Sequence, residues 1–420
     1  MATSDLQGLT CWLIDTRSLW PGQHIKDAAS DVLQLLSNNE RVAVLRKMFI
    51  ADARMSLASA MLKRLYVSRA LSIPWKDVNI ARKGDPKHGK PCAVLPDGSF
   101  AKIDFNISHQ AGLVSLVGWN PSSGQSQSAL VGADIVCVNE RDDYRTIDQE
   151  GFDAWIDIYE DIFSEAERWD MKYNVDYITL LDGRFIQGGN LGRADRCVQR
   201  NKDLAVTLPT GETQSFNSDL LIDAKLRRFY SFFCYKEAYI KLAGEALLAP
   251  WLKELEFQNV RSPKPGTVAR CSTHGTWGEK ASDVEVVLHG SKVDDVKMTL
   301  QAFEENFMLA TAVQGLQDLE APPFTKLDLE NDVLAFATTL SPIAMPGVIW
   351  TVEKHDIFKI SLVVRREALN ITLSVEGCTG LKNVVHFYRV RVTEFSTRGG
   401  QNSPNFVSGE FTTTRSIRSF

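Results

Sequence analysis

The sequence lacks the features that mark membrane, secreted and zinc-knuckle proteins. No apolar run approaches the roughly 18 residues that a membrane-spanning helix needs. The first residues, Met1–Asp5, lack the basic and apolar stretches of a secretory signal. The seven cysteines are odd in number, widely spaced and without a CxxC pair, which argues against a disulfide framework or a zinc site. We therefore expect a cytoplasmic protein with reduced, mostly buried thiols and no membrane contact.

A strong charge of either sign is also absent. The net charge is −5 over 420 residues, which disfavours a protein that binds nucleic acid or anionic membranes through its overall charge. The residues after Ser341 differ, because their 10 Lys+Arg and 6 Asp+Glu give +4 and leave −9 for the first 341 residues. Any basic binding site must therefore be local. The length and the 44% of apolar residues predict two or three folded domains.

Hydrophobic patterning predicts a mixed α and β fold. Apolar residues recur at three- and four-residue steps over 52–66, 152–166 and 223–243, which predicts amphipathic helices there. Gly244 follows the last of these as a stop signal. Shorter apolar runs predict strands at 103–107, 113–117, 130–138, 284–288, 307–313, 360–364 and 369–375.

Composition shifts suggest where the parts of the chain begin and end. A Ser/Gly-rich spacer at 122–124 marks a first boundary, and helical periodicity is lost over 170–222. The glycines of Gly183–Gly192 lack the Gly-Lys-Ser/Thr ending of a phosphate loop, so we interpret that stretch as a flexible excursion. The predicted parts are an N-terminal half, a C-terminal half with an insertion at 170–222, and a C-terminal extension with a disordered end: 1–124, 125–320 and 321–420.

Two short patterns near predicted strands carry groups suited to phosphate or metal. Lys90 precedes a proline in a loop, and the pair Ser108-His109 ends a predicted strand; these donors suit phosphate oxygens. Gly132 stands two residues before Asp134, and one carboxylate at a strand can bind Mg²⁺ together with phosphates and waters. Taken alone, the Ser-His pair is better explained by a structural histidine, and a Gly-x-Asp pattern often occurs by chance.

Two further patterns lie on predicted helices. Glu167 in FSEAE lies beside the buried stripe of its helix and could face a cleft, although the pattern taken alone favours a solvated carboxylate. Glu237 and Lys241 in KEAYIK are four residues apart and share one helix face, where a surface ion pair is the alternative. That helix is rich in aromatic residues, so we expect it to be buried. Burial favours a functional pair, with Glu237 on a metal and Lys241 on a phosphate.

The order of the patterns FNISHQ, GADIV, FSEAE and KEAYIK resembles the 4'-phosphopantetheinyl transferase superfamily. The similarity is to its larger, surfactin-synthetase-activating type and to fungal members. It covers residues 9–320, and Arg54-Met55-Ser56-Leu57-Ala58 and Ile73-Pro74-Trp75 are also similar. The separation of Glu167 from Glu237 exceeds the family's usual spacing, and the insertion at 170–222 accounts for it.

The resemblance implies an activity and a set of site residues. Such enzymes move 4'-phosphopantetheine from coenzyme A to a serine hydroxyl of an acyl or peptidyl carrier protein and leave 3',5'-ADP. Asp134 and Glu237 would bind Mg²⁺, and Glu167 would be the general base. Lys241 would hold the transferring phosphate. The other implied contacts to coenzyme A are Arg54, Arg82, Lys90, Ser108, His109 and Lys236. Of these, Arg54 and Arg82 are preferred over Arg46 and Lys47.

One position departs from the pattern of many bacterial members. Val136 stands where those members carry a second acidic metal ligand, so the third ligand must be water or another side chain. Gln110, directly after the Ser-His pair, is our candidate, and Glu140 is a weaker one. Two other functions stay open: a coenzyme A or carrier binder without turnover, and a Mg²⁺-dependent hydrolase of coenzyme A.

The resemblance also implies a fold and partners. It predicts two similar α/β halves joined edge to edge, each a helix on a small, mainly antiparallel sheet, with the active site in the cleft between them. The implied partners are carrier domains of polyketide synthases, nonribosomal peptide synthetases, aminoadipate reductase and fatty-acid synthase. A monomer is expected because the two halves already form the cleft. Carriers present an acidic helix, so Lys225–Arg228 is a candidate docking stretch, with a solvated helix start as the alternative.

Overall fold

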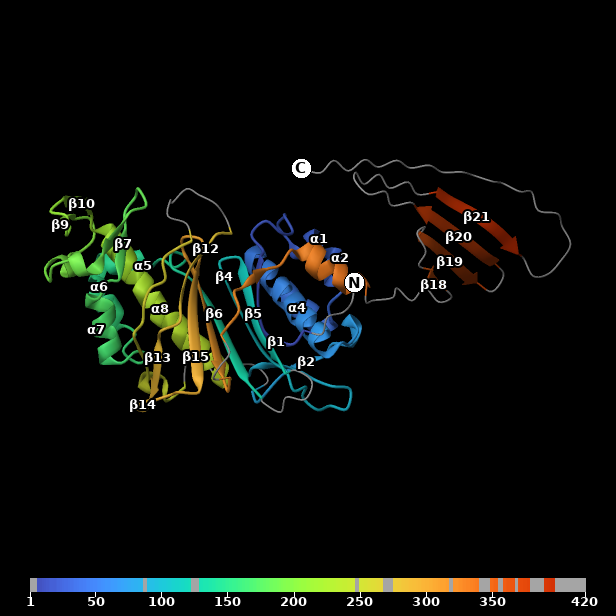
Figure 1. Ribbon diagram of the computed structural model, residues 1–420, viewed down its shortest axis with the longest axis horizontal. Helices are drawn as coiled ribbons and strands as arrows, with labels where there is room; N and C mark the ends of the chain where they lie inside the picture. Colours follow the sequence, from blue (N-terminus) through green and yellow to red (C-terminus); the bar gives the residue numbers. More distant parts are fainter. Residues whose placement is uncertain are drawn as a thin grey trace. The chain divides into compact units, whose positions relative to one another are not determined.

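The computed structural model describes most of the first 339 residues and the backbone of four later strands. By contacts, the chain divides into two compact units, Met1–Leu340 and Ser341–Phe420. Figure 1 shows the first unit as two adjoining helix-on-sheet layers. The residues described with side chains are 6–85, 89–121, 128–245, 249–266, 275–316 and 320–338.

The N-terminal half of the first unit is a four-stranded sheet covered by one long helix. Its strand order is β17-β1-β5-β4, with β17 parallel to β1 and the other neighbours antiparallel. The helix packs against the two strands nearest the second half. These elements are α4 (Ile50–Leu71), β1 (Gly8–Asp15), β4 (Asp104–Gln110), β5 (Leu113–Asn120) and β17 (Thr325–Lys326).

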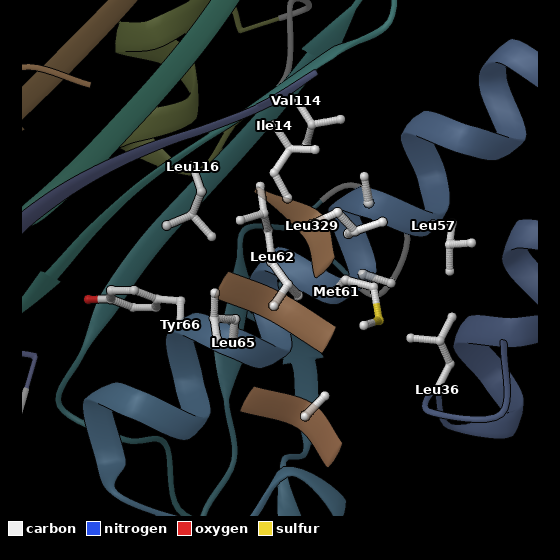
Figure 2. Close-up of a cluster of buried hydrophobic side chains, with 14 of the residues drawn as sticks. Ile14, Leu36, Leu57, Met61, Leu62, Leu65, Tyr66, Val114, Leu116 and Leu329 are labelled. Atoms are coloured by element: carbon white, nitrogen blue, oxygen red, sulfur yellow. The ribbon is translucent and has the colours of Figure 1, made fainter. Parts of the chain in front are cut away.

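The core of this half forms around α4. Thirteen of the 22 residues of the helix are buried, including the consecutive run Leu57–Leu62. They are buried because the sheet covers one side of α4 and three short elements also pack against it: α1 (Ile25–Ala28), α3 (Asn38–Leu45) and η5 (Leu329–Leu334). Tyr66 packs directly over Gly118, where an added Cβ would lie 2.3 Å from the tyrosine ring. Figure 2 shows this cluster, with side chains from both helix and sheet: Ile14, Leu57, Met61, Leu62, Leu65, Val114, Leu116 and Leu329.

The C-terminal half repeats the arrangement with different strands. Its sheet has the order β12-β15-β16-β6, and all neighbours are antiparallel. One long helix packs on it and ends at Gly244, which has φ 78° and confirms the predicted stop signal. The elements are α8 (Asp219–Ala243), β6 (Leu130–Cys137), β12 (Trp277–Ala281), β15 (Val296–Phe303) and β16 (Phe307–Gln314).

The halves meet where β4 lies beside β6. Side chains of β4 bond to the main chain of β6: Asp104 Oδ2 accepts from the Val131 N–H at 2.8 Å, and Asn106 Oδ1 accepts from the Ala133 N–H at 3.3 Å. Away from the helices, one buried cluster spans both sheets. The predicted α+β fold with small, mainly antiparallel sheets is therefore confirmed, and the two halves join edge to edge.

The predicted single helix over 152–166 is two helices in the structure. α6 (Phe152–Asp157) ends early, and α7 (Glu165–Tyr173) starts after a capping box in which Ser164 and Glu167 bond to each other's backbone. Apolar periodicity continues through the break, which is why it does not reveal the boundary. α5 (Asp143–Glu150) precedes both.

The insertion at 170–222 is folded, so its interpretation as a flexible excursion is wrong. Two short hairpins surround their own small core, which includes Ile178, Leu204 and Leu221. The strands are too short for a clear alternating pattern. They are β7 (Tyr177–Thr179), β8 (Phe185–Gln187), β9 (Asp203–Thr207) and β10 (Thr213–Asn217), with turns η2 (Gly188–Asn190) and η3 (Asp195–Cys197).

The remaining elements of the first unit are short. Those before the junction are α1 (Ile25–Ala28), α2 (Ser30–Leu33), α3 (Asn38–Leu45), η1 (Trp75–Asp77), β2 (Ile80–Arg82) and β3 (Pro91–Ala93). Those after α8 are η4 (Leu252–Glu254), β11 (Leu255–Gln258), β13 (Glu285–Leu288) and β14 (Ser291–Lys292).

The last segment of the first unit returns to the N-terminal half. After β17 come the π-helical turn η5 (Leu329–Leu334) and α9 (Ala335–Thr339), and Leu329 and Val333 join the core under α4. The chain therefore divides at Leu340 rather than at the predicted residue 321. This segment is too short to show a periodic pattern that would connect it to a core formed near the start of the chain.

The second unit contains a four-stranded antiparallel sheet in the order β18-β19-β20-β21. The strands predicted at 360–364 and 369–375 lie within it. Most of the stretch predicted to be disordered lies outside the described residues. The strands are β18 (Val348–Glu353), β19 (Phe358–Arg366), β20 (Leu369–Gly377) and β21 (Arg389–Ser396).

The cysteines behave as their spacing predicts. All five in the described part are free thiols, and four of them are buried. Burial raises the pKa of Cys11 to about 12 and that of Cys137 to about 11, so both thiols stay protonated near neutral pH. Within the described residues, every helix is too short or too polar to cross a membrane.

Candidate active site

The close approach of α8 to β6 creates the centre of the site. A Cβ at Gly132 would lie 2.0 Å from the Ala238 carbonyl oxygen, so only glycine lets the helix lie this near the strand. Asp134 stands two residues further along β6 and therefore on the same face. The glycine of the Gly-Ala-Asp pattern thus brings the carboxylate of Asp134 beside the last turns of α8.

Four polar side chains meet there from three separate segments. Lys241 Nζ lies 2.5 Å from Asp134 Oδ1 and 3.0 Å from Ser108 Oγ, and the Ser108 hydroxyl donates to Asp134 Oδ1 at 2.8 Å. Lys241 Nζ lies 3.9 Å from Glu237 Oε2 on the same helix. The predicted shared face of Glu237 and Lys241 is confirmed. The arrangement unites β4, β6 and α8 at the junction of the two halves.

The electrostatics of this cluster centre on two carboxylates and one ammonium. Burial, reinforced by the charge of Asp134, raises the pKa of Glu237 to about 7, against the opposing effect of Lys241. Burial lowers the pKa of Lys241, but Asp134 and Glu237 outweigh it and leave that pKa above its usual value. The carboxylates of Asp134 and Glu237 repel each other, and a divalent ion bound between them would remove that repulsion.

The donor chemistry of the cluster suits magnesium. Mg²⁺ is usually held in proteins by one or two carboxylates plus substrate phosphates and waters, rather than by an all-protein cage. Among the described residues there is no group of three or more His, Cys, Asp or Glu placed to hold a metal ion. Asp134 and Glu237 therefore fit a Mg²⁺ site that the substrate completes, and do not fit a closed structural site.

A pocket of about 390 Å³ opens beside the cluster, between α4 and α8. Glu237 and Lys241 form part of its wall, so the pocket and the carboxylate cluster are continuous. The rest of the wall comes from α4, the loop between β2 and β3, β4 and the residues after α8: Ser59, Lys63, Arg82, Gly89, Lys90, Pro91, Asn106, Ile107, His109, Ile240, Gly244 and Glu245.

The wall is rich in cations. Lys63, Arg82, Lys90 and Lys241 line it, with His109 beside them. Lys90 forms a buried ion pair with Asp104, and burial lowers its pKa. Burial, helped by the positive charge of Lys241, also lowers the pKa of His109, which favours a neutral imidazole. Such a wall suits a ligand with several phosphates.

Described residues on the two sides of the loop between β2 and β3 contact each other. The Arg82 Nη1 donates to the Gly89 carbonyl at 2.7 Å. A Cβ at Gly89 would lie 1.8 Å from the Lys83 carbonyl oxygen, so glycine is required there. These contacts hold Arg82 and the residue before Lys90 together at the pocket wall.

Glu167 and Lys236 form a second, fully buried pair. Their charged groups are 3.0 Å apart, and Lys236 Nζ also donates to the carbonyls of Ile162, Leu252 and Leu255 at 2.8, 3.0 and 2.5 Å. Glu167 accepts from the Ser164 N–H at 3.1 Å and from the Phe257 N–H at 3.0 Å. Burial raises the pKa of Glu167 and lowers that of Lys236. Through these bonds the pair connects α7, α8 and β11.

Comparison with known proteins identifies the family. Residues 22–122 match the family described as "4'-phosphopantetheinyl transferase, N-terminal". A 4'-phosphopantetheinyl transferase from Aureobasidium melanogenum is 89% identical over 338 residues, which are 80% of this chain and all of that protein. The chain belongs to the 4'-phosphopantetheinyl transferase family.

More distant relatives carry related names. The 4'-phosphopantetheinyl transferase NpgA of Emericella nidulans is 33% identical over 364 residues, which cover 79% of this chain and 94% of that protein. The L-aminoadipate-semialdehyde dehydrogenase-phosphopantetheinyl transferase of Schizosaccharomyces pombe is 36% identical over 126 residues, 30% of this chain and 46% of that protein. The predicted transferase superfamily with fungal-like character is confirmed.

Not every residue predicted from the family resemblance lines the pocket of this transferase. Arg54 donates from Nε and Nη2 to the Trp20 carbonyl at 3.2 and 3.0 Å, which fixes the chain before α1 to α4. Gln110 ends β4 two residues after Ser108, so strand alternation places it on the same side of the strand. Neither side chain is in the wall of the pocket.

The position without the second acidic residue is a core position. Val136 is 1% exposed and packs in the apolar cluster between β6 and α8. A carboxylate there would be surrounded by apolar side chains in this structure. This transferase has an apolar residue where the Gly-x-Asp-x-Glu pattern has its glutamate, and the surroundings of that residue are apolar as well.

Lys225–Arg228 is not a docking surface, and it is not a solvated helix start either. Lys225, Arg227 and Arg228 are all buried. Their cationic groups are already bound within the protein: Lys225 to the Arg196 carbonyl, Arg227 to the carbonyls of Pro263 and Glu305, and Arg228 to the carboxylates of Asp170 and Asp176. The sequence of Lys225–Arg228 is strongly polar, yet aromatic residues and residues of the insertion around α8 bury it.

Sequence reasoning missed Ser59, Lys63 and Asn106 in the pocket wall. Ser59 and Lys63 are four residues apart and so share a helix face, whereas Arg54 and Lys63 are nine apart, about 180° around the helix. The helical period could therefore have shown that Arg54 and Lys63 cannot both face one pocket. The position of the sheet under α4 decides whether Arg54 or Lys63 points toward the pocket.

Proposed function

We propose that this protein transfers 4'-phosphopantetheine from coenzyme A to a serine hydroxyl of carrier proteins and releases 3',5'-ADP. The observation that carries the proposal is the continuity between the Asp134–Glu237–Lys241 cluster and the cation-lined pocket of about 390 Å³. Membership of the 4'-phosphopantetheinyl transferase family supports the same reaction.

The pocket residues are suited to coenzyme A. Its three phosphates are anionic, and the side chains of Lys63, Arg82 and Lys90 line one cavity. Burial lowers the pKa of both lysines, and Lys90 is paired with Asp104, so a bound phosphate would favour their charged forms. His109, with its lowered pKa, serves as a neutral hydrogen-bonding group there. Lys241 stands nearest to the carboxylates, so we assign it to the phosphate that is transferred.

Asp134 and Glu237 are the residues that would hold Mg²⁺, with Gln110 as the third protein ligand. Bound Mg²⁺ would supply charge neutralisation on the pyrophosphate. The Ser108 hydroxyl, which donates to Asp134 Oδ1 at 2.8 Å, holds that carboxylate in place. Replacing Gln110 by Leu should raise the Mg²⁺ concentration needed for half-maximal rate, and Gln187→Leu in the insertion is the control.

In the reaction, the serine oxygen attacks the phosphorus that carries the pantetheine. One P–O bond forms, the bond to the bridging oxygen breaks, 3',5'-ADP leaves, and the hydroxyl proton passes to solvent. Orientation and charge stabilisation carry most of the rate in such a transfer. We assign Glu167 a positioning role through Lys236 rather than the role of base, because both of its oxygens already accept hydrogen bonds.

The acceptors we propose are carrier domains of several biosynthetic enzymes. The Schizosaccharomyces pombe relative is named for L-aminoadipate-semialdehyde dehydrogenase, which favours the carrier of aminoadipate reductase. Carriers of polyketide synthases, nonribosomal peptide synthetases and fatty-acid synthase are the further candidates. We also propose a cytoplasmic monomer, since one chain supplies every residue of the site.

Intact-mass spectrometry of an apo carrier tests the proposal. The carrier is incubated with the protein, coenzyme A and Mg²⁺, and a gain of one phosphopantetheine is expected. A carrier whose acceptor serine is replaced by alanine is the control and should gain nothing. Release of 3',5'-ADP without a carrier would instead show a hydrolase, and tight binding of coenzyme A without any mass gain would show a binding protein.

A further inference from the structure

An apolar and cationic surface lies between α3 and α4. Val42, Leu45, Met48 and Phe49 are 38%, 44%, 88% and 66% exposed. Four of the nine exposed large apolar residues in the described part of the chain thus fall within eight consecutive positions. We call the residues 42–49 the α3–α4 patch. Exposed apolar side chains gathered in this way mark interaction surfaces.

The charge of the patch is of one sign. Arg46 and Lys47 are exposed within it, and no ion pair to either is found among the described residues. Glu40 carries the nearest preceding carboxylate, and it forms an ion pair with Arg64 at 2.7 Å. A partner that matches this surface must present apolar side chains flanked by carboxylates.

The patch lies at the approach to the active-site pocket. It leads directly into α4, whose Ser59 lines the pocket, and a rise of 1.5 Å per residue puts Phe49 about 15 Å from Ser59 along the helix. The start of α4 also touches the turn between β4 and β5, because the Gly112 N–H donates to Met55 Sδ at 3.2 Å.

The strand β4 connects this part of α4 to the reacting groups. Ser108 on β4 bonds to Asp134 at 2.8 Å, and β4 ends at Gln110, two residues before the Gly112 that contacts Met55. The start of α4 therefore lies on the side of the pocket where β4 ends.

We propose that the α3–α4 patch is the docking surface for the acceptor carrier protein. Apolar side chains of the carrier would cover Met48 and Phe49, and carboxylates beside its acceptor serine would face Arg46 and Lys47. This inference rests on the proposed function, because the serine must reach a phosphorus held beside Asp134 and Lys241. The carrier therefore has to cover the rim of this pocket, and the patch is an exposed apolar part of the surface near it.

Steady-state kinetics with the full-length protein tests the surface. The variants are Phe49→Ser, Met48→Ser and Lys47→Glu. Phe49 is the N-cap residue of α4 and makes no side-chain cap bond, so serine there should not weaken the helix. Leu181→Ser and Lys202→Glu, at exposed positions of the insertion, are matched controls. Each patch variant should raise KM for the carrier by about 10-fold, the effect of losing one interface anchor.

Two other kinetic constants show whether a patch variant affects only carrier binding. KM for coenzyme A and kcat at saturating carrier should stay within about twofold of wild type, because no patch residue lines the pocket. A carrier with a glutamate near its serine changed to lysine should restore part of the affinity of Lys47→Glu. An unchanged carrier KM in all three variants, or an equal rise in both control variants, would overturn the proposal.

Direct binding separates this inference from the proposed function. A carrier with its serine replaced by alanine is titrated against the protein in the presence of coenzyme A, which needs no turnover. Weaker binding by the patch variants supports the docking surface even where wild type transfers nothing. Transfer by wild type with equal binding by all variants refutes the docking surface alone. A wild-type dimer that Phe49→Ser dissociates in sedimentation would show that the patch joins two copies of this chain instead.

Discussion

The ammonium of Lys241 lies 2.5 Å from Asp134 Oδ1 and 3.9 Å from Glu237 Oε2, so one cation serves two carboxylates. Asp134 belongs to β6 and Glu237 to α8, while Ser108 reaches the same carboxylate from β4 in the other half. The cluster therefore exists only when both halves are folded and joined. Its chemistry depends on this junction.

Removing the charge of Asp134 should abolish most activity while leaving the fold intact. In Asp134→Asn the amide keeps the size of the side chain but removes one anionic oxygen ligand and the ion pair with Lys241. We expect kcat/KM for phosphopantetheine transfer to fall by about 100-fold or more, as for loss of a preorganised charge contact. Asp203→Asn, at an exposed position of the insertion, is the control. Wild-type transfer by Asp134→Asn would contradict the assigned metal site.

Glu237 should make the stability of the metal-free protein depend on pH. Burial and Asp134 raise its pKa from 4.5 to about 7, so the folded protein binds this proton more tightly than the unfolded chain. The stabilisation from this group is complete below pH 4.5 and is lost as the pH rises through 7. In EDTA, wild type should therefore lose on the order of 3 kcal/mol relative to Glu237→Gln between about pH 5 and pH 8.

Chemical denaturation at the two pH values measures that difference. Glu212→Gln, an exposed residue of the insertion, is the control and should follow wild type. Added Mg²⁺ should reduce the loss in wild type at the higher pH, because a bound cation favours the ionised carboxylate. Parallel pH profiles for wild type and Glu237→Gln would show that Glu237 does not titrate in this range.

The long periodic elements were predictable because local sequence determines them. The apolar stripe and Gly244 correctly indicated where α8 ends, and i,i+4 spacing correctly paired Glu237 with Lys241. The break between α6 and α7 was not predicted, since it depends on the cap at Ser164. The return of 325–339 to the first half was not predicted either, because two-residue strands carry no pattern.

The residue types of the site could be predicted from the sequence, but their burial and their bonding partners could not. The order of the motifs named Ser108, Asp134 and Lys241 as site residues. It did not predict that their side chains bond to one another across the junction of two sheets. The burial of Lys236 and of Lys225–Arg228 follows from carbonyls and carboxylates far away in sequence. A sequence shows which groups can ionise, while tertiary packing decides which of them meet solvent or a ligand.

Loss of Lys236 should destabilise the protein through the charge that it leaves behind. Lys236→Met removes the partner of the buried Glu167 carboxylate, and breaking a buried pair in this way costs about 3–5 kcal/mol. The double variant Glu167→Gln/Lys236→Met should be more stable than Lys236→Met. Its glutamine keeps the capping box and leaves no unpaired charge. Urea denaturation of the four proteins in this cycle gives the coupling energy, and additive effects would contradict a direct ion pair.

Glu167→Gln by itself distinguishes a positioning residue from a base. The carbonyl oxygen of glutamine can keep one of the two hydrogen bonds from the backbone, the bond from the Ser164 N–H that closes the capping box, and it loses the bond from Phe257. Because the capping box is kept, we expect kcat to fall by less than about 10-fold and the pH profile of kcat to keep its shape. Loss of a general base typically costs about 100-fold or more and removes a limb of the profile. A fall of that size, in a variant that melts like wild type, would restore Glu167 to the reaction.

Adding one methyl group at Gly132 should disturb both stability and transfer. The new Cβ would lie 2.0 Å from the Ala238 carbonyl oxygen, so α8 must move away from β6. Overpacking of this kind costs about 1–3 kcal/mol, and the shift separates Lys241 from Asp134. Gly189→Ala is the matched control, since nothing lies within 4 Å of its added Cβ. Gly132→Ala should melt earlier and transfer more slowly than Gly189→Ala. Equal melting and transfer by the two variants would mean that α8 does not rest on β6 at this glycine.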